Sequence, residues 1–522
     1  GKMSTSTGIN NMRKPCGGCG NAGVRPAGKL FSTAGRGVQV SLWLLKENKE
    51  KLIFAGIGST DFMALTPEGY YTASPEASKG VHFVKGMKIF TFENFDMLFN
   101  RPDKVLQSIG IADQSLIDAY YRAWKKRIGK MGFTENHLVA DLQLPEVKIL
   151  DEIPMETSQK YLNFNVLLSD SKYKLSRLNL YVNDVPVYGM KGDNFGFINK
   201  KEVKKNIRLQ LNTGRNYVQV STHNENGIES LKQGFEIFCN APALETTLYA
   251  VCIGVSDYLN YDKTTGDLNF AAKDAMDLGK LLQNQSSVFT NVKIIQVTDK
   301  NATKDNIHSI KEQLLQSGVN DGVMLFFAGH GLLDNKLDYY LATYDVNFEQ
   351  PSGKGLPYEE LENLLDSIPA RKKIMFIDAC HSGEVDKEET VFLAAAPVNQ
   401  QPNITTRGFK NVGGNIGLLN SFELIQELFG NIQKGTGAVV ITSASGVEVA
   451  LESSEWNNGA FTYTLLQSLK TTAADKNGDG TVSVSEIRNY IIENVDKITG
   501  GRQHPTTRKG NLEFDFKITN LK

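Results

Sequence analysis

The stretch Ile374-Met-Phe-Ile-Asp-Ala-Cys-His-Ser-Gly383 decides the fold of the C-terminal half of this chain. Its first four residues are apolar, as in a strand buried on both faces, and polar residues with a cysteine follow directly. A second apolar run, Val323–Ala328, leads in the same way into Gly329-His330-Gly331. Each run therefore predicts a buried strand that ends at a residue able to do chemistry.

The sequence around these two runs alternates strand patterns with helix patterns. We expect strands at Leu248–Val255, Val292–Val297, Gly322–Ala328, Lys373–Asp378 and Ala438–Ser443. Helices are expected at Phe270–Leu282, Lys304–Ser317 and Tyr358–Asp366. This alternation indicates an α/β domain with a mostly parallel sheet and helices on both of its faces.

His330 and Cys380 are the candidate catalytic residues. Reactive groups gather at the carboxyl ends of parallel strands, so these two side chains would meet if their strands are neighbours. An imidazole can take the proton of a thiol and later protonate a leaving amine. Backbone N–H groups of Gly331 and Cys380 could then form an oxyanion hole. A buried cysteine that only fills space is the alternative.

Residues 246–520 resemble the caspase and metacaspase superfamily of cysteine peptidases, which has a caspase-like α/β fold. Four stretches carry the resemblance: Leu248–Gly254, Leu268–Asp274, Phe326–Gly331 and Phe376–Gly383. Gly459-Ala-Phe-Thr462 also resembles a motif of the family. Animal caspases carry Gln where Asp378 stands, so the motif is closer to metacaspase-type and bacterial members. The resemblance implies a cysteine endopeptidase that cleaves proteins with a Cys–His dyad.

The same resemblance implies a preference for basic residues at P1. In metacaspase-like proteins, the acid two residues before the nucleophile lines the S1 pocket. A second acid lies in the motif matched here by Asn269–Asp274. If Asp378 and Asp274 sit together, they would favour Arg or Lys and repel Asp. For Asp274, an ordinary surface carboxylate is the alternative interpretation.

Residues 384–414 follow the nucleophile, where the family has a linker between its large and small halves that is often self-cleaved. With a basic P1 preference, the candidate cleavage sites are Lys387, Arg407 and Lys410. An uncut surface loop is the alternative, and the sequence fits both equally well.

The stretch 475–486 matches the twelve-residue EF-hand pattern. Its candidate calcium ligands are Asp475, Asn477, Asp479, Thr481 and Glu486, with Gly480 at the tight turn. Helices are expected on either side, at Phe461–Leu469 and Ser485–Val495. Calcium is thus the cofactor that the sequence suggests, and no organic cofactor is expected. The alternative is a polar turn in which Glu486 opens a helix.

The N-terminal half has a different pattern. Residues 1–38 contain no Asp or Glu, six Lys or Arg and nine Gly, which predicts a basic, flexible or partner-bound tail. Residues 39–140 indicate short strands followed by helices at Arg101–Ile109 and Ser115–Gly129. Residues 145–242 indicate a small β-sandwich of immunoglobulin-like type, in which Asn183-Asp184 forms a turn.

Composition narrows the partners and the compartment. A net charge of −1 argues against bulk attraction to nucleic acid or acidic membranes. No apolar run is long enough to predict a membrane span, and no signal peptide is expected. The five cysteines suggest free thiols in a reducing cytoplasm, and Cys16-Gly-Gly-Cys19 is half of a zinc site without an evident other half.

Three functions are compatible with these observations. The first is an endopeptidase that acts on protein substrates, with its tail and β domains binding a protein partner. The second is a catalytically inert caspase-like scaffold. The third is a calcium-dependent binding or adhesion protein. Intact His330 and Cys380 favour the first.

Overall fold

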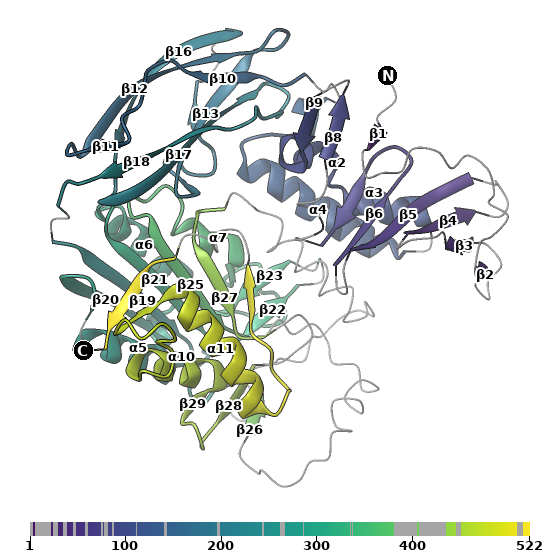
Figure 1. Cartoon of the computed structure of the whole chain (residues 1–522). Helices are drawn as coiled ribbons and strands as arrows, with labels where there is room; N and C mark the ends of the chain where they lie inside the picture. Colours follow the sequence, from purple (N-terminus) through teal and green to yellow (C-terminus); the bar gives the residue numbers. More distant parts are fainter. Residues whose placement is uncertain are drawn as a thin grey trace.

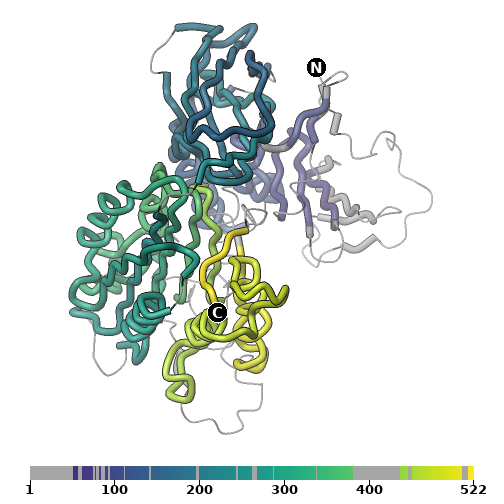
Figure 2. The backbone as a smooth tube through the Cα atoms, turned by 60° about the vertical axis from the view of Figure 1, so that its left-hand side comes forward, coloured from purple at the N-terminus to yellow at the C-terminus, as the bar shows by residue number. Residues whose placement is uncertain are grey.

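The computed structural model shows three bodies that follow one another along the chain (Figure 1, Figure 2). They are an N-terminal body of strands and helices, a β-sandwich and a C-terminal α/β domain. The residues that the structure describes are 4–5, 22–24, 30–34, 39–44, 49–57, 61–74, 77, 82–85, 88–110, 112–139, 143–195, 199–242, 245–260, 267–285, 287–334, 336, 338–379, 404–406, 435–444, 450–508 and 515–521.

The C-terminal domain is built on a six-stranded sheet. Its strands, in spatial order, are β20 (Asn291–Thr298), β19 (Thr247–Gly254), β21 (Gly322–Ala328), β25 (Lys372–Asp378), β27 (Val439–Thr442) and β31 (Thr506–Arg508). All neighbouring pairs are parallel except β27 with β31. The strands β19, β21 and β25 are buried almost throughout, which accounts for their unbroken apolar sequences. The predicted α/β fold is confirmed.

Helices cover both faces of this sheet (Figure 1). One face carries α5 (Ala271–Asn284), α10 (Ala460–Lys470) and α11 (Val484–Thr499), and the other carries α6 (Lys304–Leu314) and α7 (Tyr358–Asn363). Gly254 ends β19 where α5 packs closest: a Cβ there would lie 2.4 Å from the Ala271 carbonyl oxygen. None of the helices in the described part of the chain is long and apolar enough to cross a membrane.

Three small sheets and a short 3-10 helix complete this domain. They are β22 (Gly331–Leu333), β23 (Tyr339–Leu341) and β24 (Leu356–Pro357); β26 (Ile404–Thr406), β28 (Leu451–Ser453) and β29 (Asn458–Gly459); β30 (Thr481–Ser483) and β32 (Lys517–Asn520); and η3 (Asp299–Asn301). Two of these strands are next in sequence to parts of the site described below. β22 begins at the residue after His330, and β29 leads directly into α10.

The middle body consists of two sheets packed face to face. One contains β10 (Glu146–Ile149), β12 (Tyr161–Ser169) and β16 (Glu202–Gln210); the other contains β11 (Glu156–Thr157), β18 (Gln233–Cys239), β17 (Gly214–Asn224), β13 (Leu175–Val182), β14 (Val185–Pro186) and β15 (Asp193–Asn194). Buried apolar side chains from both sheets form one cluster. Asn183 and Asp184 form the turn, with φ of 51° and 61°, as a two-residue hairpin loop requires. The immunoglobulin-like character of this sandwich stays a prediction.

The N-terminal body combines two sheets with helices. Its elements are β2 (Ala22–Val24), β3 (Leu30–Ala34), β4 (Gln39–Leu44), β5 (Lys49–Ile57), β6 (Asp61–Leu65) and β7 (Tyr71–Ala73) in one sheet; β1 (Ser4–Thr5), β8 (His82–Lys85) and β9 (Lys88–Thr91) in another; and η1 (Phe92–Phe95), α2 (Asp96–Phe99), α3 (Pro102–Ile109), α4 (Gln114–Lys130) and η2 (Glu135–His137). The expected boundary at residue 38 is not a break in the first sheet, because β3 pairs with β4 along its whole length. Backbone pairing therefore joins this part of the tail to the rest of the sheet.

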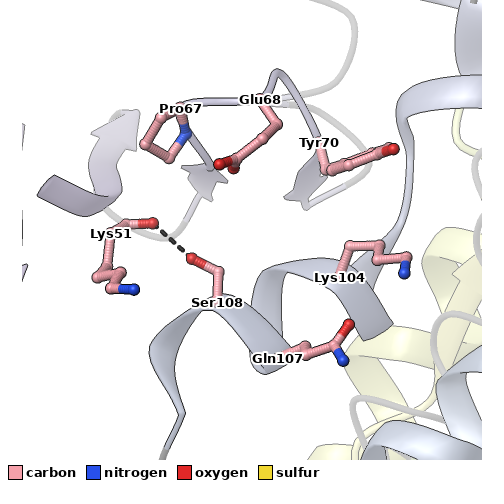
Figure 3. A pocket seen from close by; sticks show the side chains of 7 residues that line it. All are labelled: Lys51, Pro67, Glu68, Tyr70, Lys104, Gln107 and Ser108. Atoms are coloured by element: carbon pink, nitrogen blue, oxygen red, sulfur yellow. Dashed lines mark hydrogen bonds between the residues drawn. The ribbon is translucent and has the colours of Figure 1, made fainter. Parts of the chain in front are cut away.

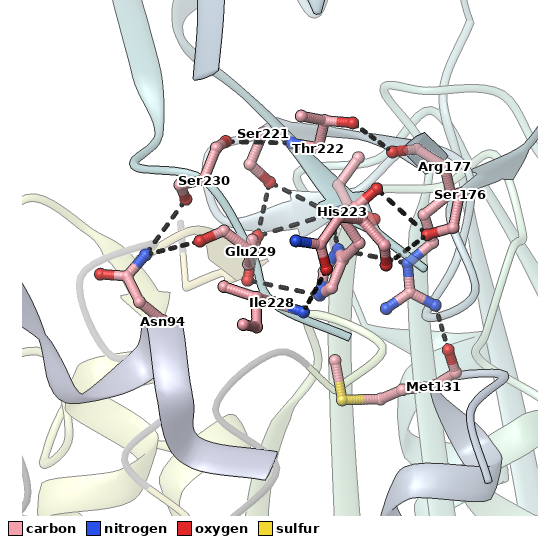
Figure 4. A network of polar contacts seen from close by, with 12 residues as sticks. Asn94, Met131, Ser176, Arg177, Ser221, Thr222, His223, Ile228, Glu229 and Ser230 are labelled. Carbon is pink, nitrogen blue, oxygen red and sulfur yellow. Dashed lines mark hydrogen bonds and ion pairs between the residues drawn. The ribbon is translucent and has the colours of Figure 1, made fainter. Parts of the chain in front are cut away.

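A buried polar network joins the sandwich to the N-terminal body (Figure 4). Arg177 on β13 donates to the Met131 carbonyl oxygen, and its guanidinium lies 4.5 Å from the centroid of the Phe133 ring. Burial lowers the pKa of Arg177 to about 10. Asn94 donates to the Glu229 carbonyl oxygen at 3.0 Å. The two bodies are therefore linked through groups removed from water.

The sandwich also contacts the C-terminal domain, at the amino ends of its central strands. Arg371, just before β25, donates to Asn212 Oδ1 at 2.5 Å and to the Gln210 carbonyl oxygen at 2.7 Å. Asn212 in turn donates to the carbonyl oxygen of Val319, which precedes β21. Because Arg371 is buried here, its pKa falls to about 9.

Candidate active site

The carboxyl ends of β21 and β25 lie side by side. The two strands are parallel neighbours in which Ala328 is opposite Asp378. The Gly329 N–H donates to the Asp378 carbonyl oxygen at 3.3 Å, so the contact continues past the strands. His330 and Cys380 each follow this last pair by two positions, although Cys380 itself lies outside the described residues. The register thus leads both chain segments to the same level of the sheet edge.

His330 is held through both of its backbone groups. Its N–H donates to the Tyr258 hydroxyl at 3.0 Å, and its carbonyl oxygen accepts from the Ala342 N–H at 2.9 Å. The residue is 3% exposed. The centroid of its ring lies 5.3 Å from that of Tyr258 and 5.9 Å from that of Phe348. Two hydrogen bonds therefore fix the backbone of His330, and two aromatic rings pack beside its imidazole.

Tyr258 is a site residue that the sequence did not indicate. Its hydroxyl also donates to the Val255 carbonyl oxygen at 3.0 Å, which ties the end of β19 to His330. Gly329 makes room for this contact, because a Cβ there would lie 3.1 Å from the Phe327 ring and 3.2 Å from the Tyr258 hydroxyl. The available signal was only that Tyr258 comes shortly after a buried strand.

The two carboxylates expected in the S1 pocket both contact the start of α10. Asp378, at the end of β25, accepts from the Thr462 hydroxyl at 2.6 Å. Asp274, in the first turn of α5, accepts from Asn458 Nδ2 at 2.8 Å and from the Gly459 N–H at 3.2 Å. Both aspartates are 0% exposed. The alternative interpretation of Asp274 as a surface carboxylate is therefore wrong.

The amino end of α10 is a suitable place for these acids, because a helix N-terminus carries partial positive charge. Glu452 adds a third buried carboxylate nearby. Its Oε1 accepts from the N–H and the side-chain amide of Asn269 at 2.9 and 3.0 Å. Glu452 is also paired with Gly459 in the β28–β29 ladder. Sequence reasoning missed Glu452, although the motif ending in Thr462 pointed to this segment.

Of the remaining residues predicted for a peptidase, the structure describes Gly331 but not the candidate cleavage sites. Gly331 opens β22 opposite Leu341, and its oxyanion role stays a prediction. The candidate cleavage sites Lys387, Arg407 and Lys410 lie outside the described residues. So do Cys16 and Cys19.

The loop 475–486 lies between α10, which ends at Lys470, and α11, which begins at Val484. Gly480 has a φ of 78°, the left-handed conformation that the tight turn needs. Ser483 caps α11, and Glu486 accepts from the Ser483 N–H at 3.0 Å. The loop strand β30 pairs with β32 near the end of the chain. In this geometry Glu486 also opens a helix, as the alternative interpretation states.

The donor set of this loop fits calcium in type and spacing, since all predicted ligands are oxygens. Its carboxylates already have other partners. Asp475 accepts from the Gly478 N–H at 2.8 Å, and Lys517 Nζ lies 2.9 Å from Asp479 Oδ2. The Thr481 hydroxyl, followed by Lys517, lowers the pKa of Asp479. Across the described ranges, no three His, Cys, Asp or Glu side chains are placed together to hold a metal ion.

A pocket of about 230 Å³ lies in the N-terminal body, away from the elements that carry His330 (Figure 3). Its lining residues are Lys51, Pro67, Glu68, Tyr70, Lys104, Gln107 and Ser108. They contain no nucleophile beside a base and no set of metal ligands. The pocket therefore does not contribute to the candidate active site.

Comparisons with known proteins bear on the C-terminal domain. The family model of the caspase domain, Peptidase C14, matches residues 247–517, slightly more than half of the 522 residues. No curated protein matches the chain. Fibronectin(III)-like modules of Clostridium thermocellum CbhA cover 19% of this chain and 100% of their own, with 16% identity and a TM-score of 0.14. A polysaccharide deacetylase from Bacillus cereus covers 55% and 78%, with 12% identity and a TM-score of 0.14. Structural similarity this low indicates neither the fold nor the function of this chain.

Proposed function

Because this chain belongs to the caspase-domain family of cysteine peptidases, we propose that it is an endopeptidase in which Cys380 is the nucleophile and His330 its base. The observation that carries the proposal is the register of β21 and β25, in which Ala328 is opposite Asp378. Membership of a peptidase family implies that the substrates are proteins.

The reaction would proceed in two steps. His330 accepts the thiol proton, and Cys380 Sγ forms a bond to the scissile carbonyl carbon. N–H groups of Gly331 and Cys380 bind the oxyanion. The C–N bond then breaks, and the amine leaves with the proton from the imidazolium, which leaves a thioester. Water gives a proton to His330 and adds to the thioester; the carboxylic acid leaves, and the proton returns to the thiolate.

We also propose that Arg or Lys occupies P1. Asp378 and Asp274 accept hydrogen bonds from the neutral side chains of Thr462 and Asn458, which are not cations that would compete with a basic P1 residue. A guanidinium or ammonium would be a matched partner for these acids, whereas an Asp side chain would be repelled. Both aspartates are buried. A P1 side chain would therefore contact them only after neighbouring groups move aside.

Hydrolysis of fluorogenic peptides with Arg, Lys or Asp at P1 tests this function. We expect cleavage after Arg and Lys, none after Asp, and no activity in Cys380→Ala. Asp378→Asn should lower kcat/KM for Arg peptides about 100-fold, because a charged contact to P1 is lost. Faster cleavage after Asp than after Arg would overturn the specificity. If no peptide is cleaved with or without calcium, an inert scaffold or a calcium-dependent binding protein would be favoured.

Self-cleavage after Lys387, Arg407 or Lys410 is a separate proposal, supported by the basic P1 preference. The intact mass of the purified wild type, compared with that of Cys380→Ala, tests it. We expect fragments only in the wild type. Identical intact masses would reject self-processing and leave the peptidase proposal standing.

Calcium binding at residues 475–486 is a further proposal, supported by the oxygen donors, by Gly480 and by the cap at Ser483. Calcium would supply a local positive charge shared by the side chains of Asp475, Asn477, Asp479 and Glu486 and by the backbone carbonyl oxygen of Thr481. Binding would have to separate Asp479 from Lys517, which now holds it. Lys517 therefore acts as an internal competitor in this proposal.

Titration calorimetry with calcium tests the site without an activity readout. We expect one bound ion in the wild type, none in Asp475→Ala, and tighter binding in Lys517→Met because the competing ammonium is gone. No heat in either the wild type or Lys517→Met would remove the site. If calcium binds but a chelator leaves peptide cleavage unchanged, the site has no part in regulation.

A further inference from the structure

Helix α4 of the N-terminal body presents a row of basic side chains to the peptidase domain. Arg122, Lys126 and Lys130 are spaced four residues apart and so share one face of the helix. Lys126 Nζ lies 2.7 Å from Asp338 Oδ1, and Arg122 Nη2 donates to the Lys336 carbonyl oxygen at 2.6 Å. Two members of the row therefore bind the turn between β22 and β23.

The row also reaches α7. Lys130 Nζ lies 3.4 Å from Glu362 Oε2, and Lys126 Nζ lies 3.8 Å from Glu359 Oε1. Glu362 is 1% exposed, so this pair is partly removed from water. Burial, followed by acidic neighbours, raises the pKa of Tyr340 on this side of the domain. A basic helix face thus meets an acidic domain face.

The contacted turn belongs to the hairpin that begins beside His330. The carbonyl oxygen of His330 accepts from Ala342, the residue directly after β23, so the base and its hairpin are joined at both strands. Asp334 stiffens the far turn by accepting from the Asp338 N–H at 2.9 Å. The three residues of β22 span about 10 Å. A short, hydrogen-bonded hairpin therefore separates the α4 contact from His330.

Helix α4 is itself fixed in place. Arg127 donates to the Asn100 carbonyl oxygen at 2.6 Å, within the N-terminal body. Met131, the C-terminal cap of the helix, accepts from the buried Arg177 of the sandwich. The N-terminal body and the sandwich thus hold α4 in place, and its basic row contacts the C-terminal domain.

We propose that Lys126 is a positioning residue for catalysis: with Arg122 and Lys130 it docks α4 on the β22–β23 hairpin and so fixes the backbone of His330. The inference rests on the proposed function, because that function makes His330 the base. It gives the N-terminal body a part in the reaction beyond recruiting substrate. The Lys126 side chain is 39% exposed, and ion pairs of such partly exposed side chains are individually weak, so we assign its contact with Asp338 to the alignment of His330 and not to stability.

Charge reversal tests the inference. In Lys126→Glu, a carboxylate would face Asp338 and Glu359, and we expect kcat to fall about tenfold with KM within about twofold, as for a misaligned base. Adding Asp338→Lys restores an opposite-charge pair and should restore most of the lost kcat. Lys125→Glu is the matched control, since Lys125 is exposed and lies off this face. It should behave as the wild type.

The pH profile of Cys380 alkylation, followed by peptide mass mapping, provides a second readout. A nearby imidazole lets the thiolate form at lower pH, so the profile of Lys126→Glu should shift to higher pH and return in the double variant. Unchanged kcat and profile in Lys126→Glu would overturn the inference, and so would a loss that Asp338→Lys does not restore. If the wild type cleaves no peptide, the proposed function fails. The alkylation profile then still shows whether Lys126 positions His330 beside Cys380, because it needs no cleavage.

Discussion

His330 and His223 are two buried histidines with similar surroundings. They are 3% and 1% exposed, and each lies beside an aromatic ring, Tyr258 at 5.3 Å and Phe133 at 5.6 Å between centroids. They differ in their place on a strand. His330 follows the end of β21, whereas His223 lies within β17 (Figure 4). There the Nδ1 of His223 accepts from Asn179 Nδ2 at 2.9 Å.

The His223 cluster even contains the residue types of a catalytic triad. Glu229 Oε2 lies 3.8 Å from His223 Nε2, and the Ser221 hydroxyl is close by. That hydroxyl, however, donates to Glu229 and not to the histidine, and all three residues are buried. Burial and polar partners therefore do not mark an active site by themselves. A strand end that meets a second reactive residue is the better criterion.

The largest expected effect separates the two histidines by activity. His330→Ala should lower kcat/KM toward Arg peptides by about a thousandfold, because the general base is lost. His223→Ala should leave the activity of the folded molecules unchanged. Initial rates, normalised to the folded fraction from circular dichroism, measure both. Similar losses in the two variants would erase the distinction.

The next effect concerns the stability of the His223 cluster. Arg177→Met should lower the free energy of unfolding by about 3 kcal/mol, because the buried acceptors around the guanidinium lose their donor. Arg215→Met is the control: Arg215 pairs with Glu236 on the same sandwich, but its side chain is 73% exposed. We expect less than about 1 kcal/mol there. Equal losses in urea unfolding would show that burial of the cluster contributes nothing.

A third effect, spread over several pH units, concerns Lys373, a buried polar group at the opposite end of β25 from Asp378. Lys373 donates to the Leu365 and Thr436 carbonyl oxygens at 2.9 and 3.0 Å, and burial lowers its pKa from 10.5 to about 7. Between these pH values the unfolded chain holds a proton that the folded chain lacks, so stability rises with pH. The slope is at most about 1.4 kcal/mol per pH unit.

In Lys373→Met this contribution disappears, so the stability difference from the wild type should grow as pH rises through that window. Urea unfolding across the window measures it, and peptide cleavage should keep its wild-type pH dependence. Lys470→Met, at an exposed position, is the control and should follow the wild type. A constant difference between Lys373→Met and the wild type would show that Lys373 stays charged in the fold.

The sequence predicted the central strands of the six-stranded sheet well because they are unbroken apolar runs. Gly322–Ala328 was predicted with the bounds that β21 has, and Lys373–Asp378 differs from β25 by one residue. Adjacency of these strands was only a condition of the prediction that His330 and Cys380 meet. Adjacency and register both depend on pairing across the sheet and not on either strand alone.

Other site residues and strands could not be predicted from the sequence around them. Tyr258 contacts His330, which lies far away in the chain, and no local pattern predicts that contact. Thr462 lies in a motif that the sequence did show, but its contact with Asp378 was not predicted. Strand β3 is only five residues long, with polar Ser32 and Thr33 in its middle, so its pairing with β4 was not predicted from its sequence. Strand β18 was not among the expected strands, although Phe235, Ile237 and Cys239 alternate as a half-buried strand requires.

The adjacency of β25 and β27 has a consequence for refolding. Four residue pairs, from Ile374–Val439 to Ile377–Thr442, join these strands across the segment that contains the proposed cleavage sites. In the uncut chain this pairing closes as a loop within one molecule, at a cost that grows only slowly with loop length. A chain cut there after folding would keep both pieces in one sheet. Once denatured, it would have to recover that sheet by a second-order encounter, so its recovery would depend on protein concentration.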